Sequence, residues 1–153
     1  MPNTYTQIYI HVIFAVARRE CLISKHHQEE VNKFITGIIR NQRHKLISIG
    51  GMPDHLHMLI GMRPDVDLSD LVRDVKSSSS AWINDNRWMR GRFNWQEGFG
   101  GFSYSRSQID RVARYILNQD AHHARRSFRN EYLGLLKKFH VEFKEEYAFE
   151  WIE

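Results

Sequence analysis

The order of the hydrophobic patterns constrains the fold of this chain more than any other feature. Residues 7–16, QIYIHVIFAV, alternate apolar side chains on one face, which is the pattern of a β-strand. Ser24 precedes a segment with helical spacing, whose apolar positions are Val31, Phe34, Ile35, Ile38 and Ile39. KLISIG (45–50) and HLHMLIGM (55–62) read as two further strands, and the turn residues GGMPD separate them. The first half of the chain therefore predicts strand, helix, strand, strand.

The second half continues this series. Asp67 is expected to cap a second helix with an apolar face of Leu68, Leu71, Val72, Val75 and Trp82. The stretch 92–105 is expected to contain a fourth strand, and Ser105 or Ser107 can begin a third helix with Ile109, Val112 and Ile116 facing inward. A further helix is predicted near the C-terminus, with apolar residues at helical spacing: Phe128, Tyr132, Leu135, Leu136 and Phe139. The order predicts an α+β, ferredoxin-like (RRM-like) βαββαβ fold with two helices on one sheet face, the other face open, and C-terminal helices.

Length and composition set the class of protein. The 153 residues suit a single domain, with a core at about 5–127 and a helical tail at 128–153. The single cysteine, Cys21, allows no internal disulfide and no cysteine-rich zinc site, and it favours a cytoplasmic protein. No apolar run approaches the roughly 18 residues of a membrane span, and no signal-peptide pattern is present, so we expect no membrane association.

Positive charge is concentrated in one block. The net charge is +4, yet residues 86–129 carry nine arginines against three acidic residues, while residues 130–153 carry three lysines against six glutamates. Arginine suits bidentate phosphate contacts, so a polyanionic partner is indicated. The candidate contacts are Arg73, Lys76, Arg87, Arg90, Arg92, Arg111 and Arg114. Trp88, Phe93 and Trp95 lie among them and could stack on bases, or could pack in the core beneath solvated arginines.

His55 and His57 are two residues apart on the third strand, so they share one face while Leu56, Met58 and Ile60 share the other. Two such imidazoles can chelate one metal ion. With nine histidines, chance predicts about half of one such pair in a chain of this length, so this spacing leaves packing and chelation both open. His11, on the first strand, could approach the same site, but a surface position is expected for it. The adjacent pairs His26–His27 and His122–His123 point apart, and we expect them to be solvated.

Tyr115 and Gln119 are four residues apart, which places them on one face of the third helix. Without the histidines, Tyr115 would be interpreted as a half-buried packing residue and Gln119 as a solvated residue at the end of the helix. Together with two histidines, a neutral carboxamide would leave a divalent cation its full charge, and such a site attracts a phosphate. A tyrosine one turn away could attack the phosphorus and form a phosphotyrosine intermediate, given a positive environment or a base to remove its proton.

DHLHMLI followed by Y-x-x-x-Q resembles the single-tyrosine HUH transposases of bacterial insertion sequences, a superfamily that includes the REP-associated tyrosine transposases. WQEGFGGFSYS (95–105) is similar to the segment before the tyrosine helix in that family, although relatives often carry Tyr at the position of Phe99. The likeness covers roughly Tyr5 to Ser127.

The resemblance implies a function and a site. It implies that His55, His57 and Gln119 bind Mg²⁺ or Mn²⁺ and that Tyr115 is the nucleophile. It also implies homodimers that cleave and rejoin single-stranded DNA at hairpin-bearing element ends through a 5′-phosphotyrosine intermediate. Gly98, Gly100 and Gly101 could let the tyrosine helix swing, or could form a bulge or turn.

Two other functions are compatible with parts of this pattern. A non-catalytic ferredoxin-like module that binds single-stranded nucleic acid would use exposed aromatics on its central strands. A phosphoesterase with paired His-x-Thr/Ser motifs is disfavoured because the chain has no such motif.

Overall fold

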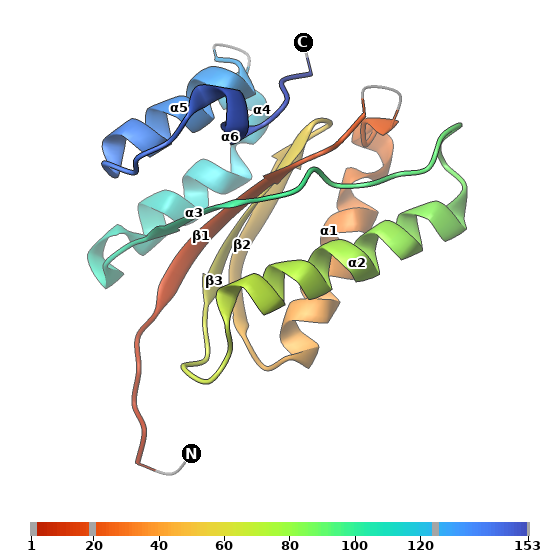
Figure 1. Ribbon diagram of the computed structural model, residues 1–153. Helices are drawn as coiled ribbons and strands as arrows, with labels where there is room; N and C mark the ends of the chain where they lie inside the picture. Colours follow the sequence, from red (N-terminus) through yellow and green to blue (C-terminus); the bar gives the residue numbers. More distant parts are fainter. Residues whose placement is uncertain (1–2, 19–20, 124–125, 153) are drawn as a thin grey trace.

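A four-stranded antiparallel sheet forms the centre of the molecule (Figure 1). The computed structural model describes residues 3–18, 21–123 and 126–152. The strands are β1 (Tyr9–Ala15), β2 (Lys45–Met52), β3 (His55–Gly61) and β4 (Gly100–Ser103), in the order β2-β3-β1-β4. Every neighbouring pair is antiparallel. This order is the ferredoxin-like topology, so the predicted fold class is confirmed.

Helices α1 (Lys25–Asn41) and α2 (Leu68–Asn86) cover one face of the sheet. The Asp67 side chain accepts hydrogen bonds from the backbone amides of Ser69 and Asp70, so it caps α2 as predicted. Ser24 precedes α1, but its hydroxyl contacts His27 Nδ1 instead of capping the helix. The core between these layers is apolar and includes Val12, Phe14, Leu56, Met58, Ile60, Ile35 and Val75.

The opposite face of the sheet is covered, which corrects the expectation of an open face. Helices α3 (Ile109–Leu117), α4 (Gln119–His123), α5 (Phe128–Lys138) and α6 (Glu145–Ala148) gather on this side (Figure 1). This face carries apolar side chains that the helices bury. Ile13 and Phe102 of the sheet pack with Phe128 and Tyr132 of α5. Leu59 packs in the same way with Ile109, Val112 and Ile116 of α3.

The predicted third helix is broken before Gln119. Ser105 and Gln108 form a capping box at a single 3₁₀ turn (Arg106–Gln108), and α3 follows directly. The helix ends at Leu117, and α4 begins at Gln119 after the intervening Asn118. Tyr115 and Gln119 therefore lie on two successive helices rather than on one.

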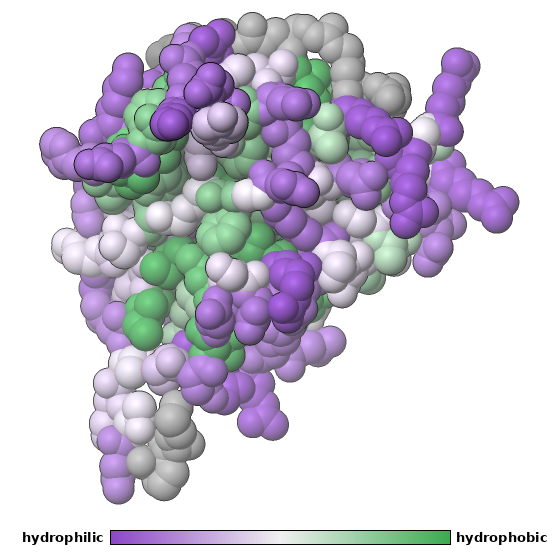
Figure 2. All heavy atoms as spheres, in the orientation of Figure 1, coloured by the Kyte–Doolittle hydropathy of each residue, from purple (hydrophilic) through white to green (hydrophobic). Residues whose placement is uncertain are grey.

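Hydrophilic side chains cover much of the face drawn in Figure 2, and hydrophobic ones gather near its centre. Within the described residues, no helix has both the length and the apolar character needed to cross a membrane.

Candidate metal centre and tyrosine site

His55 and His57 lie on β3 beneath the C-terminal helices. In the strand register they are opposite Ala15 and Ile13 of β1, so both side chains point to the face that α3 to α5 cover. Both are buried, with 1% and 0% of their surface exposed. The shared face predicted from their spacing is thus found in the structure, inside the protein rather than on open surface.

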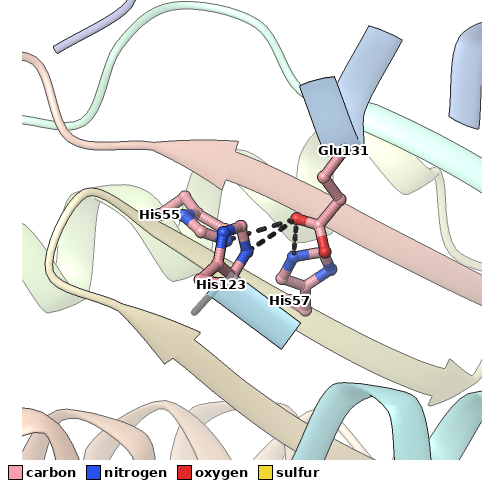
Figure 3. Close-up of side chains that lie close together, drawn as sticks. All are labelled: His55, His57, His123 and Glu131. Atoms are coloured by element: carbon pink, nitrogen blue, oxygen red, sulfur yellow. Dashed lines mark hydrogen bonds and ion pairs between the residues drawn. The ribbon is translucent and has the colours of Figure 1, made fainter. Parts of the chain in front are cut away.

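Each of these imidazoles has a partner on its outer nitrogen. His55 Nδ1 lies 2.7 Å from Asp54 Oδ1, and His57 Nδ1 lies 2.8 Å from Nε2 of the buried His11. The inner nitrogens, Nε2 of both rings, face a common centre (Figure 3). Histidines that bind metals have this arrangement, in which the outer nitrogen is fixed by a hydrogen bond and the inner one is directed at the ion.

Glu131 of α5 occupies that centre. Its carboxylate is 1% exposed, and Oε1 lies 3.4 Å from His55 Nε2, 3.0 Å from His57 Nε2 and 3.2 Å from His123 Nε2 (Figure 3). The second oxygen, Oε2, accepts a hydrogen bond from the Tyr115 hydroxyl. One carboxylate therefore contacts three imidazoles on one side and the candidate nucleophile on the other.

Gln119 also reaches this centre. Its side chain is buried, and Oε1 lies 3.2 Å from His55 Nε2 and 2.9 Å from His123 Nε2. Its amide nitrogen lies 3.4 Å from the Tyr115 carbonyl oxygen and from Glu131 Oε2. The structure thus brings together His55, His57, Gln119 and Tyr115 even though α3 ends between the last two.

Tyr115 is half-buried, and its ring meets His57 edge-on with 5.9 Å between ring centroids. Burial raises the pKa of its phenol, and the neighbouring Glu131 carboxylate raises it further. The hydroxyl therefore keeps its proton in this arrangement. A positive charge at the centre would oppose the effect of Glu131.

The protonation of the buried groups follows from their surroundings. Burial lowers the pKa of His57 to about 4 and holds the pKa of His11 well below its usual value, so both rings are neutral at pH 7. For His55, burial lowers the pKa, but hydrogen bonds to Asp54 and Glu131 outweigh it and leave the pKa raised. Burial alone would raise the pKa of Glu131, yet hydrogen bonds from His123, His55 and His57 lower it, so its carboxylate is ionised.

Three residues of this centre were missed or misplaced by the sequence reasoning. His11 was expected at the surface, but α3 and α5 cover it and it is 0% exposed. His123 was expected to be solvated, but it is half-buried and contacts Gln119 and Glu131; the side chain of His122 lies outside the described part. Glu131 was not considered at all. The sequence does contain one hint of its burial. Glu131 is three residues after Phe128 and four before Leu135, so it lies on the apolar face of that helix.

The donor set fits a metal ion. His55, His57, His123 and Glu131, here called the histidine–glutamate cluster, each offer one ligand atom, and these atoms lie within 4.8 Å of one another. The Nδ1 partners of His55 and His57 allow both Nε2 atoms to carry a lone pair toward a cation. His55 and His57 together with Gln119 offer a second set of ligand atoms, which overlaps the first.

A cavity of about 280 Å³ lies beside Tyr115. Its lining includes Tyr115 and Glu131 together with the cationic side chains of Arg111, Arg126 and Lys138. Arg111 was among the predicted DNA contacts, and Arg114 is exposed on the same helix. The cavity therefore places the candidate nucleophile, the Tyr115 hydroxyl, beside positive charge that could neutralise a phosphate.

The other predicted DNA contacts lie around a groove between α2 and residues 92–99. Arg73, Lys76 and Arg92 line it, although Arg73 also pairs with Asp70 and Asp74, and Lys76 donates to the carbonyl oxygens of Gln96 and Gly98. Arg87 and Arg90 are exposed near the end of α2.

The aromatic residues of this region pack inward. Phe93 and Trp95 are buried in the core, and Trp88 stacks on His27 with 3.9 Å between ring centroids. Phe93 and Trp95 therefore do not form an exposed stacking surface for bases, and the core-packed alternative holds for them.

Comparison with known proteins gives the family. The sequence pattern of the family described as "Transposase IS200 like" matches residues 4–119, and no curated protein matches the whole sequence significantly. A transposase candidate from Deinococcus radiodurans R1 shares 20% identity at a TM-score of 0.60, over 78% of this chain and 95% of that one. A REP-associated tyrosine transposase bound to a REP hairpin shares 12% identity at a TM-score of 0.61, over 100% of this chain and 93% of that one. Since the family pattern spans most of the sequence, the chain belongs to the IS200-like transposase family.

Proposed function

We propose that this protein cleaves and rejoins single-stranded DNA at the ends of an insertion sequence, through a 5′-phosphotyrosine intermediate on Tyr115. One observation carries the proposal: the Tyr115 hydroxyl, the histidine pair of β3 and Gln119 meet in one centre beside a cavity with cationic walls. His55, His57 and Gln119 are the proposed ligands of Mg²⁺ or Mn²⁺. The ion would polarise the scissile phosphate.

The reaction uses the side chains as follows. The Tyr115 oxygen attacks phosphorus, the bond to the 3′-oxygen breaks, and the 5′-phosphate stays on the tyrosine. Glu131 Oε2 accepts the Tyr115 hydroxyl hydrogen, so it is positioned to take the phenol proton. Attack of a free 3′-hydroxyl on the phosphotyrosine reverses the step and rejoins strands, with no need for an energy source.

The DNA path is proposed from the distribution of charge. Arg111 is placed to contact phosphates next to Tyr115, and Arg73, Lys76, Arg87, Arg90, Arg92 and Arg114 to hold more distant ones. Hairpin DNA is the proposed partner, supported by the structural relative that is bound to a REP hairpin. We further propose that the protein acts as a homodimer in the cytoplasm.

The test is formation of a covalent adduct. The protein is mixed with end-labelled single-stranded DNA carrying a hairpin and with Mn²⁺, and a denaturing gel is examined for a protein–DNA species. Tyr115→Phe should abolish the species. Tyr104→Phe is the matched control, because Tyr104 lines the same cavity and should leave the adduct intact.

The outcomes separate the two candidate functions. An adduct in Tyr115→Phe would show that another residue is the nucleophile. If the native protein bound the DNA but formed no adduct with any divalent ion, a non-catalytic nucleic-acid-binding module would replace the proposed enzyme.

A further inference from the structure

The C-terminal helices contribute ligand atoms that the family pattern does not include. That pattern matches residues 4–119, whereas His123 and Glu131 lie beyond it on α4 and α5. Nevertheless Glu131 Oε1 is within 3.0 to 3.4 Å of one nitrogen of each histidine in the cluster (Figure 3). These two residues therefore sit in the same centre as the β3 pair.

The hydrogen bonds around the cluster favour a cation at its centre. Asp54 Oδ1 can accept the Nδ1 hydrogen of His55, and His11 Nε2 can accept that of His57 when His11 carries its own hydrogen on Nδ1. Without a metal ion, hydrogens on the Nε2 atoms can bond to the oxygens of Glu131 or Gln119. When Nδ1 carries the hydrogen instead, a neutral imidazole directs its Nε2 lone pair at these oxygens. Lone pairs facing carboxylate and amide oxygens repel one another unless a proton or a cation lies between them. A metal ion satisfies all four ligand atoms at once.

We infer that His123 and Glu131 are metal ligands, and that with His55 and His57 they form a three-imidazole, one-carboxylate site. This ligand set extends the one in the proposed function, on which it rests for the location of the site. Nitrogen-rich sets of this kind suit first-row transition-metal ions from Mn²⁺ to Zn²⁺. Mg²⁺ prefers oxygen ligands and water, so it is the weaker ion for the complete set.

Glu131 then joins the metal to the nucleophile. Oε1 faces the histidines while Oε2 accepts the hydrogen bond of Tyr115. A cation beside Oε1 draws charge from the carboxylate, which lessens its effect on the phenol. Gln119 remains close enough to His55 and His123 to replace Glu131 when the carboxylate moves.

The test is direct measurement of metal binding without DNA. The full chain, stripped with a chelator, is titrated with Mn²⁺ while the free ion is followed by electron paramagnetic resonance, and with Co²⁺ while the visible spectrum is recorded. Glu131→Gln and His123→Gln should each weaken Mn²⁺ binding by more than the ~10–100-fold expected for loss of an outer partner of a ligand. Co²⁺ should show the intense bands of a low-coordinate nitrogen-rich site in the native protein and weaker bands in both variants.

Two control variants and a test of folding accompany these measurements. Glu142→Gln and His26→Asn remove exposed groups of the same kinds and should bind Mn²⁺ normally. Circular dichroism and a thermal melt confirm that each variant is folded, and Glu131→Asp, which keeps the carboxylate, should recover part of the affinity. Native Mn²⁺ affinity in folded Glu131→Gln and His123→Gln overturns the inference, as does native Mg²⁺ affinity above that for Mn²⁺. Loss of the DNA adduct with metal binding intact would instead refute only the proposed function.

Discussion

The imidazole of His11 lies beside His57 in the sheet and contacts that ring directly. Its Nε2 lies 2.8 Å from His57 Nδ1, the two rings stack with 5.0 Å between centroids, and His11 is 0% exposed. Held neutral by burial, His11 can accept the Nδ1 hydrogen and keep the lone pair of His57 on the inner nitrogen. We therefore predict that His11 is a positioning residue for His57 rather than a metal ligand.

Replacing His11 by Phe keeps an aromatic ring but removes the acceptor. We expect Mn²⁺ to bind ~10–100-fold more weakly, the range for loss of an outer partner of a metal ligand. His11→Asn supplies an acceptor oxygen and should restore part of the affinity. Long-range ¹H–¹⁵N spectra of the metal-free protein report which nitrogen of His57 carries the hydrogen; an unchanged spectrum in His11→Phe would contradict the positioning role.

A second residue-scale prediction concerns Trp95, which is 8% exposed. Its indole N–H donates a 2.9 Å hydrogen bond to Ser79 Oγ, and Ser79 is itself fully buried. Ser79→Ala leaves the indole without this acceptor, so the free energy of unfolding should fall by about 1–3 kcal/mol in urea denaturation. Ser77→Ala, on the exposed side of α2, should change it by no more than about 0.5 kcal/mol.

At the scale of single residues, the sequence predicted site and capping residues that follow from a local pattern. It missed residues whose position depends on distant parts of the chain. His55 and His57 follow from strand alternation, and Asp67 follows from helix capping. His123 depends on where α3 ends, and no strong helix breaker marks Asn118. Glu131 contacts β3 residues more than 70 positions earlier in the chain, and local spacing cannot express that contact.

Among the elements, α3 approaches the sheet closely at Gly50 of β2. A side chain there would clash with the backbone carbonyl of Ile116, the residue after Tyr115, and Ser48 Oγ donates to the Ala113 carbonyl oxygen 2.9 Å away. The absence of a side chain at Gly50 therefore allows α3, which carries Tyr115, to lie this close to the sheet and to the histidine–glutamate cluster.

Gly50→Ala should push α3 outward. We expect a loss of about 1–3 kcal/mol in the free energy of unfolding, as for other overpacked sites, together with slower adduct formation by Tyr115. Gly37→Ala is the matched control, because nothing lies within 4 Å of its added methyl on α1 and the helix should gain about 0.5–1 kcal/mol. Normal adduct formation in Gly50→Ala would show that this contact does not position the tyrosine.

Lys76 connects α2 to the segment before β4. Its ammonium lies 2.8 Å from the Gln96 carbonyl oxygen and 2.5 Å from that of Gly98, and burial lowers its pKa to about 8. Because the folded pKa is below that of the unfolded chain, 10.5, the unfolded state binds more protons between these values. The protein should therefore gain stability as pH rises from about 8 to 10.5. Urea denaturation at several pH values should show this rise in the native protein and a smaller one in Lys76→Met.

Across the whole molecule, the sheet is enclosed by helices on both faces, and half of this was predictable. The position of α1 and α2 was predictable from the order of helices and strands. The alternating apolar residues of β1 and β3 form one sheet face that helices must cover. The second face was expected to be open because the ferredoxin-like arrangement places both of its helices on the other face. Ile13, Ala15 and Leu59 share the second face, and they are the apolar residues that α3 and α5 bury.

Because helices enclose both faces of the sheet, the proposed DNA contacts lie on the rims of the molecule, where charge should decide the affinity. Arg92 is exposed on the groove beside α2, whereas Arg73 on the same groove is already paired with Asp70 and Asp74. If Arg92 neutralises one phosphate, Arg92→Gln should reduce the slope of log affinity against log salt by ~0.7 for single-stranded DNA. Arg73→Gln should change it less, since its loss also frees two carboxylates, and Arg40→Gln on α1 serves as the control outside the groove. Fluorescence anisotropy with a labelled oligonucleotide at several salt concentrations measures these slopes. Equal slopes for native protein and Arg92→Gln would place the DNA elsewhere, with the cations around Tyr115 as the next surface to test.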